Sequence, residues 1–263
     1  MTFSQIHSVH FANDQEFNIC DQKHFQYKTS DGKVPDLFNQ TSVSFDLVHG
    51  PGFLPDVTVK LSIHRGNIVN LGWTYKFDQS RTGKKMFKIP DEYVSASQIP
   101  LEGDLSQFVQ IRASPFQVKF LYQDQEQTEF FGIDSLVYDD YLNWVKMHVV
   151  TEQKDNFRGI FGLGERASTD FFFKDGVYSM WSKDIPTPIE HGKFPAANMY
   201  GVHPYFMYKH KVGSWVGILY NLAAAQDWWI KNDQDKGLVN IQTVAVGGRV
   251  DLYIIMGSTP DQV

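Results

Sequence analysis

Short stretches in which apolar and polar residues alternate recur along most of this chain, and they restrict its fold more than any other feature. Residues 57–64, Val-Thr-Val-Lys-Leu-Ser-Ile-His, alternate strictly. After the turn signal Arg65-Gly66-Asn67, the pattern continues through residues 68–75. This spacing is typical of two strands joined as a hairpin, each with one face towards a core.

The same two-residue period returns through the rest of the sequence, between turns rich in Gly, Pro, Asn and Asp. Further strands are predicted at 108–112, 116–122, 129–131, 144–150, 215–220, 226–230, 238–244 and 250–256. The 3.6-residue period of a long helix is missing before the last few residues. Many short strands with such turns predict an all-β fold, an antiparallel β-sandwich.

The last residues have the pattern of a helix start. Gly257 ends the preceding strand, Ser258 or Thr259 suits the N-cap, Pro260 suits the first helical position, and Asp261 adds an acid to the first turn. The sequence holds only the opening of that helix. We therefore expect the chain to stop where a further domain begins.

Charge and composition exclude several classes of partner. The chain has 263 residues and a formal net charge of −6, which leaves no cationic footprint for nucleic acid or an acidic membrane. The single cysteine, Cys20, rules out an internal disulfide. Residues 1–13 hold no apolar run of signal-peptide length, and nothing later approaches the ~18 apolar residues of a membrane span. We expect a soluble protein, cytoplasmic as written and secretory or lysosomal if a leader is missing.

A proline-punctuated loop interrupts the strand pattern in the second half. Residues 185–195 read Ile-Pro-Thr-Pro-Ile-Glu-His-Gly-Lys-Phe-Pro, a composition that favours neither strand nor helix. Loops of this length without internal secondary structure are usually functional or disordered. The apolar residues Trp181, Ile185 and Phe194 predict that this loop docks against another surface.

Four short motifs in a fixed order add a more specific signal. They are Phe-Gly-Leu-Gly-Glu-Arg at 161–166, Met-Trp-Ser-Lys-Asp at 180–184, Asn-Met-Tyr-Gly-Val-His-Pro at 198–204 and Trp-Val-Gly-Ile-Leu-Tyr-Asn at 215–221. This order closely resembles the N-terminal domain of glycoside hydrolase family 31, which contains α-glucosidases. Residues 247–263 are similar to that family's join between the sandwich and its catalytic barrel. The resemblance covers residues 55–263 and is strong from 158 onward.

The resemblance implies a galactose-mutarotase-like β-supersandwich that precedes a (β/α)8 barrel in the same parent chain. In the family, one barrel aspartate is the nucleophile and another is the general acid of a retaining glycosidase. The resemblance thus implies no catalytic residue in this chain, and we expect neither a cofactor nor a metal site in it. The implied partners are an α-glucoside or oligosaccharide substrate and the missing barrel.

Two residues of the loop region are candidates for substrate binding. In the family an aspartate at the position of Asp184 accepts hydrogen bonds from sugar hydroxyls. Trp181 offers an aromatic ring that either stacks on a sugar or anchors the loop against the barrel. The chain has Lys183 where arginine is common, and Pro186 where some members have a second sugar-contacting hydroxyl. We therefore do not expect this chain to make the second sugar contact, on the acceptor side, that those family members make.

Other polar groups are expected to be structural. Glu165 and Arg166 are predicted to support the glycine turn and strand ends through hydrogen bonds and an ion pair. His191 and His203 do not have metal-ligand spacing with any partner, and the Asp139-Asp140 pair suits a turn. No His/Glu constellation is evident in the predicted strands.

The domain organisation and two functional alternatives stay open. Residues 1–54 form either a lead-in segment or the first strands of the same domain, and residues 55–263 form the sandwich. Beside the scaffold and substrate-recognition domain of an α-glucosidase-like hydrolase, one alternative is a stand-alone sugar-binding module. Another is an aldose 1-epimerase, which would need a general acid and base converging on the sugar.

Overall fold

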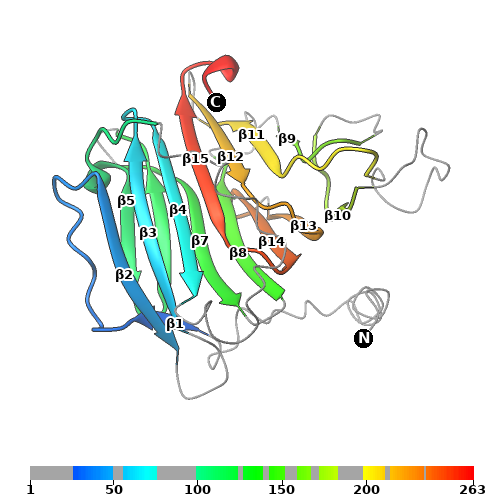
Figure 1. The fold of residues 1–263 in the computed structure, drawn as a ribbon. Coiled ribbons are helices and arrows are strands. Elements are labelled where there is room, and N and C mark those ends of the chain that lie inside the picture. Colours follow the sequence, from blue (N-terminus) through cyan, green and yellow to red (C-terminus); the bar gives the residue numbers. More distant parts are fainter. Residues whose placement is uncertain are drawn as a thin grey trace.

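Two antiparallel β-sheets pack face to face in this chain (Figure 1). The computed structural model describes residues 26–49, 56–75, 99–123, 127–138, 142–151, 159–166, 172–182, 198–210, 214–233 and 235–263. One sheet has eight strands in the order β1 (Tyr27–Thr29), β2 (Ser42–His49), β3 (Val57–His64), β4 (Ile68–Tyr75), β15 (Asp251–Gly257), β12 (Trp215–Tyr220), β11 (Tyr205–Lys209) and β9 (Ile160–Gly162). The other has seven in the order β10 (Gly176–Met180), β13 (Gln226–Asp233), β14 (Leu238–Val246), β8 (Leu142–Val150), β7 (Glu129–Tyr138), β6 (Phe116–Leu121) and β5 (Val109–Ala113).

The strands form where one side of the alternating pattern can be buried. In β8 and β14, every second residue is buried, so one face of each strand lines the core. The predicted hairpin at 57–75 is confirmed, because β3 and β4 pair from Val57↔Tyr75 to His64↔Ile68 around the turn at 65–67. The predicted all-β class and the antiparallel sandwich are likewise confirmed.

The last strand joins two distant parts of the chain in one sheet. Ile254 of β15 pairs with Val69 of β4 on one side and with Ile218 of β12 on the other. In Figure 1 the red β15 accordingly lies between the cyan β4 and the orange β12. The segments on either side of β15 therefore belong to a single eight-stranded layer.

Five strands lie outside the stretches predicted from alternation: β1, β2, β9, β10 and β11. β1 and β9 have three residues each, which is too short to show a period. β2 alternates well, and its Leu47 is fully buried. Residues 27–29 and 42–49 thus extend the eight-stranded sheet, whereas the division of the chain at residue 54 stays a prediction.

The helix start predicted at the end of the chain is a single 3-10 turn, η5 (Pro260–Gln262). Thr259 occupies the N-cap and Pro260 the first turn, as expected, but the side chain of Thr259 makes no capping hydrogen bond. The Gln262 side chain reaches back to the residue before the cap instead: its Oε1 accepts from Ser258 N at 2.8 Å and from Ser258 Oγ at 3.1 Å. A second such turn, η4 (Leu105–Gln107), is capped by Asp104, which accepts from Ser106 N.

Large aromatic side chains fill the space between the two sheets. Trp228 is fully buried and meets Phe206 and Tyr220 edge to face, with ring centroids 5.9 and 6.1 Å apart. Its indole Nε1 donates to Gln226 Oε1 at 2.9 Å, which satisfies the polar atom inside the core. Tyr208, also fully buried, donates to the Phe130 carbonyl of the opposite sheet at 2.7 Å. These contacts tie the two layers together on the side where β9 to β12 lie.

Candidate functional site

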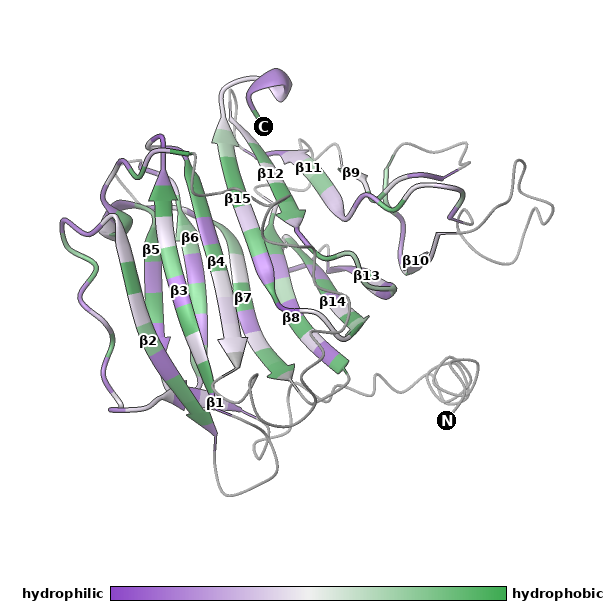
Figure 2. Cartoon of the chain, viewed as in Figure 1, coloured by the Kyte–Doolittle hydropathy of each residue, from purple (hydrophilic) through white to green (hydrophobic). Residues whose placement is uncertain are grey.

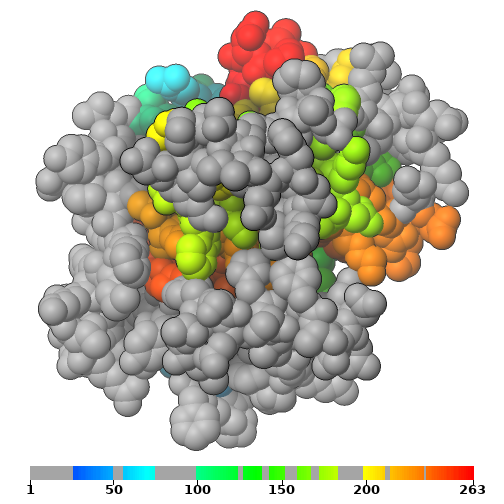
Figure 3. All heavy atoms as spheres, turned by 90° about the vertical axis from the view of Figure 1, so that its right-hand side faces the viewer, coloured from blue at the N-terminus to red at the C-terminus, as the bar shows by residue number. Residues whose placement is uncertain are grey.

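Three segments meet at the base of the loop that carries the predicted sugar-contacting residues. We call them the loop base: residues 162–166 at the end of β9, residues 178–182 at the end of β10, and residues 198–203 before β11. β9 and β10 lie at edges of their sheets, at the right-hand side of Figure 1. In Figure 3, which shows that side, yellow-green atoms from this part of the chain reach the surface.

The Gly162-Leu163 corner shapes the first segment. Gly162 has φ +128°, and a Cβ there would overlap Tyr205 O and lie 2.8 Å from Phe206 Cα. Only glycine combines that backbone angle with so close an approach of another strand. Leu163 also has positive φ, at +49°, is fully buried, and donates its N–H to Tyr205 O at 2.7 Å. The corner turns the chain away from β11 and brings residues 165 and 166 to the loop base.

Glu165 and Asn198 hold the first and third segments together. The backbone N–H of Glu165 donates to Gly201 O at 3.1 Å, and its carboxylate Oε2 accepts from Gly201 N at 3.0 Å. Asn198, 3% exposed, donates from Nδ2 to Glu165 O at 2.9 Å and to Gly201 O at 2.8 Å. Each of these two carbonyls also accepts a backbone N–H, Glu165 O from Met199 at 2.9 Å and Gly201 O from Glu165 at 3.1 Å, so Asn198 cross-links two backbone segments that are already paired. The hydrogen-bonding role predicted for Glu165 is confirmed.

Arg166 holds the first and second segments together. Its Nε donates to Leu163 O at 2.6 Å and its Nη2 to Ser179 O at 2.9 Å, while Cζ lies 5.1 Å from the centroid of the Tyr178 ring. Burial lowers the pKa of Arg166 to about 10, so the guanidinium is still a cation at neutral pH. Carbonyl oxygens and an aromatic face are suitable partners for a desolvated cation. The supporting role predicted for Arg166 at this strand end is therefore confirmed.

The two ends of the long loop are held side by side. Ser182 Oγ donates to the Tyr200 carbonyl, and Tyr200 itself is 46% exposed. Trp181, the predicted aromatic contact, is partly buried directly before Ser182. The predicted ligand Asp184 lies outside the described residues, as do Lys183, Pro186, His191 and the Asp139-Asp140 pair. His203 is exposed in the third segment, as expected of a surface histidine.

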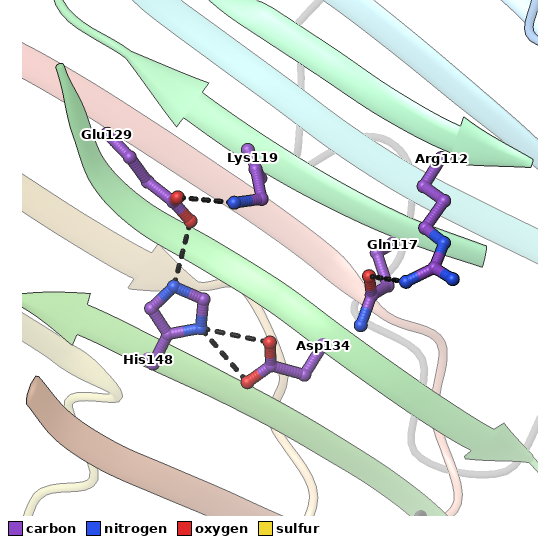
Figure 4. A network of polar contacts seen from close by, with 6 residues as sticks. All are labelled: Arg112, Gln117, Lys119, Glu129, Asp134 and His148. Atoms are coloured by element: carbon purple, nitrogen blue, oxygen red, sulfur yellow. Dashed lines mark hydrogen bonds and ion pairs between the residues drawn. The ribbon is translucent and has the colours of Figure 1, made fainter. Parts of the chain in front are cut away.

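A second polar cluster, which the sequence did not indicate, lies on the outer face of the seven-stranded sheet. His148 on β8 lies between two carboxylates of β7 (Figure 4). Its Nε2 is 2.8 Å from Glu129 Oε1, and its Nδ1 is 3.0 Å from both Asp134 oxygens. Lys119 Nζ on β6 adds an ion pair with Glu129 Oε2 at 2.7 Å. Gly132 makes room for the imidazole, since a Cβ there would lie 2.8 Å from His148 Nε2.

The His148 cluster is built for charge pairing rather than proton transfer. Burial alone would lower the pKa of His148, but hydrogen bonds to Asp134 and Glu129 raise it to about 9. Burial likewise opposes ionisation of Glu129, yet hydrogen bonds with His148 and Lys119 hold its pKa below the usual value. Both imidazole nitrogens are engaged by carboxylates. A general base needs a free nitrogen lone pair near its substrate, so this cluster does not meet the requirement of epimerase chemistry.

Sequence reasoning missed this cluster because its register is irregular. The pairing of β7 with β8 shifts between Ile133 and Ser135, so the positions opposite His148 do not follow from counting residues back from the turn. Residues 129–131 and 144–150 were both expected as strands, but the stretch of β7 that carries Asp134 was not. The signal that the sequence did offer was the presence of titratable residues within the two strands, Glu129 and Asp134 in β7 and His148 in β8.

Metal-binding and membrane-spanning features are missing from the described ranges. Within them, no three His, Cys, Asp or Glu side chains gather as a metal site would require. None of the helices in those ranges is long and apolar enough to cross a bilayer.

The two sheets define the class of antiparallel β-sandwich domains. The sequence model of one family, described as the glycosyl hydrolase 31 N-terminal galactose mutarotase-like domain, matches residues 58–228. The chain belongs to this family, and the resemblance found in the four motifs is thereby confirmed.

Relatives and solved structures agree with that assignment. Intestinal sucrase-isomaltase of Oryctolagus cuniculus is 25% identical over 190 residues, covering 72% of this chain, and the Homo sapiens protein is 25% identical over 191. A glucosidase II alpha subunit in a Glc1Man2-bound structure aligns with 98% of the chain at a TM-score of 0.70 and 13% identity. A GH31 dextranase of Flavobacterium johnsoniae in complex with glucose aligns with 92% of it at 0.56 and 16%.

The matched proteins are much longer than this chain. It spans 10% of the length of the sucrase-isomaltase relatives and 35% of the glucosidase II alpha subunit. The match therefore concerns the N-terminal domain of these hydrolases.

Proposed function

We propose that this chain is the N-terminal scaffold and substrate-recognition domain of an α-glucosidase-type retaining glycosidase. In the parent protein it would support a (β/α)8 barrel, in which two carboxylates carry out hydrolysis. The loop that follows Ser182 would bring Asp184 to the sugar site, with Trp181 as an aromatic contact beside it. The chain itself would bind but not cleave an α-glucoside or oligosaccharide.

The loop base is the observation that carries this proposal. Residues 182 and 200 are joined by a hydrogen bond, and the flanking segments are tied by Glu165, Asn198 and Arg166. A ligand on a loop is effective only if the scaffold fixes both ends of the loop. Family membership and the sugar complexes named for the aligned structures support a sugar as the ligand.

The size of the native gene product tests the existence of the barrel. An antibody against this domain should detect a protein of about three times 30.2 kDa, because the chain covers 35% of the glucosidase II alpha subunit. A band near 30.2 kDa would instead favour the stand-alone sugar-binding module. That module would show saccharide-dependent changes in melting temperature without turnover.

The role of Asp184 is tested in the full-length gene product. A hydrogen bond to a charged group contributes roughly 1.5–3 kcal/mol, so Asp184→Asn should lower kcat/KM for an aryl α-glucoside about 10- to 150-fold. Asp233→Asn is a suitable control, because Asp233 pairs with Lys236 Nζ at 2.9 Å, outside the loop base. Equal kcat/KM for the two variants would contradict the assignment. So would Asp184-dependent hydrolysis by residues 1–263 alone.

A further inference from the structure

The outer surface of the eight-stranded sheet is divided into a polar half and an apolar half. In a sheet with one solvated face, outward positions are expected to be polar. β2, β3 and β4 largely follow this rule: their polar outward residues are Ser42, Ser44, Asp46, Thr58, Lys60, Ser62, His64, Asn70 and Thr74, and their apolar ones are Val48 and Ile68. The next four strands do not. Their apolar outward residues are Tyr253 and Ile255 of β15, Trp215 and Leu219 of β12, Tyr205 and Met207 of β11, and Phe161 of β9, beside the charged Asp251 of β15 and Lys209 of β11.

The register places these apolar side chains in continuous rows. One row crosses three strands as Tyr253, Leu219 and Tyr205. A second runs from Ile255 past Gly217 to Met207 and Phe161. The inward neighbours in the same strands, such as Val216, Ile218 and Ile254, are fully buried in the core, so these strands are apolar on both faces. The contrast is visible in Figure 2, where green dominates β12 while β3 is banded.

Aromatic contacts make this surface a packed unit. Phe161 lies 4.8 Å from Phe172 and 6.4 Å from Trp215, measured between ring centroids. Gly217 lets the Tyr205 ring lie across β12, because a Cβ there would be 2.6 Å from the Tyr205 hydroxyl oxygen. The seven outward side chains are all partly exposed, and Phe172 is 43% exposed. We call this surface, Phe161, Tyr205, Met207, Trp215, Leu219, Tyr253 and Ile255, the apolar outer face.

We infer that the apolar outer face is the surface on which the catalytic domain of the parent glycosidase docks. Continuous apolar surface of this kind marks an interaction site, and aromatic residues and Met are enriched in interface cores. Within the described ranges, Lys209 and Asp251 are the only charged residues among the outward positions of β9, β11, β12 and β15, and Asp251 is buried and accepts hydrogen bonds from Asn70 and Asn221. The surface therefore suits a permanent apolar partner better than a charge-steered one. The partner is a domain of the same polypeptide because the family is defined as the N-terminal part of a glycosyl hydrolase, and this chain covers 35% of the aligned glucosidase II chain.

This inference rests on the proposed function, because it requires the parent chain to contain a catalytic domain. A full-length product near 30.2 kDa would overturn the proposed function, and the docking surface with it. A longer, active product leaves the proposed function standing and lets the docking surface be tested separately.

The test is limited proteolysis of the full-length enzyme with the double substitution Met207→Gln/Ile255→Thr. Both changes place polar atoms on the apolar outer face while keeping side-chain size and strand propensity close to the original. We expect a fragment of this domain to be released at least about tenfold faster than from the wild type, because cleavage follows the population of the undocked state. The control Ser44→Asn/Thr58→Asn changes outward positions of the polar half and should leave the rate unchanged.

Residues 1–263 alone serve to check whether the double variant folds. They also show whether a second copy of this chain, rather than the catalytic domain, covers the apolar outer face. The double variant should melt within about 2 °C of the wild-type chain, because its changes lie outside the core. If it fails to fold, Met207→Gln alone takes its place in the same assay. Equal fragment release from the Met207→Gln/Ile255→Thr enzyme and the control would overturn the inference. A dimer of residues 1–263 that persists in the full-length enzyme and dissociates in the double variant would also overturn it, in favour of a second copy.

Discussion

Replacing Gly162 with alanine is expected to lower the free energy of unfolding by about 2–5 kcal/mol. Gly162 has φ +128°, a region that L-residues avoid, so alanine would strain the backbone. The new methyl group would also overlap Tyr205 O and lie 2.8 Å from Phe206 Cα. Both obstacles are backbone atoms of a paired strand, which cannot move without breaking the β9–β11 ladder. Urea unfolding followed by tryptophan fluorescence measures the change.

Gly164→Ala is the matched control for this prediction. It lies two residues further along the same turn, and the nearest side-chain atom to a Cβ there is His203 Cδ2 at 3.9 Å. Its substitution should cost less than about 1 kcal/mol, because no steric conflict arises. Equal losses of stability in the two variants would mean that general flexibility of the turn, rather than the close approach of β11, requires glycine.

Raising the pH from 6.5 to 9.5 is expected to remove about 3 kcal/mol of stability through His148. The pKa of His148 is raised from 6.5 to about 9 in the folded chain, because hydrogen bonds to Asp134 and Glu129 outweigh the opposing effect of burial. Below the unfolded pKa both states hold the proton, and the contribution is fully present. As pH rises towards the folded pKa, only the unfolded state has released the proton, so stability falls. Above it the contribution is gone.

Urea unfolding at a series of pH values from 6 to about 9.5 tests this dependence. His148→Asn should flatten the curve in that range, because it removes the group with the raised pKa. Burial also raises the pKa of five described tyrosines, Tyr122 and Tyr253 to about 12 and Tyr178, Tyr205 and Tyr208 in the same direction, and these influence stability as the pH reaches the ordinary tyrosine value of 10. A wild-type curve that is level between pH 6.5 and 9.5 would show that the cluster does not hold His148 as a cation.

Much of the sandwich could be predicted because strand formation depends on neighbours in sequence. The stretches 57–64, 68–75 and 215–220 coincide with β3, β4 and β12, since their alternation or apolar content is visible locally. Short strands such as β1 and β9 carry too few residues to show a period, and only pairing with a longer strand makes them part of a sheet.

The candidate site was predictable in part. The motif at 161–166 pointed to the glycine turn, and Glu165 and Arg166 do support it. Asn198 was not singled out, because its importance lies in two carbonyl oxygens, one of which belongs to Glu165, 33 residues earlier. The His148 cluster depends in the same way on a register shift in β7.

The sequence by itself determined that this chain forms an antiparallel β-sandwich and which motifs relate it to family 31. Alternation and turn residues act over a few positions, so they can be read without knowing the partners of each strand. Only the tertiary structure decided that β15 lies between β4 and β12, that His148 meets two carboxylates, and that one half of a sheet's outer surface is apolar. Each of these depends on which distant strands pair and in what register. The pairing is determined by the burial of the inner face of each sheet against that of the other.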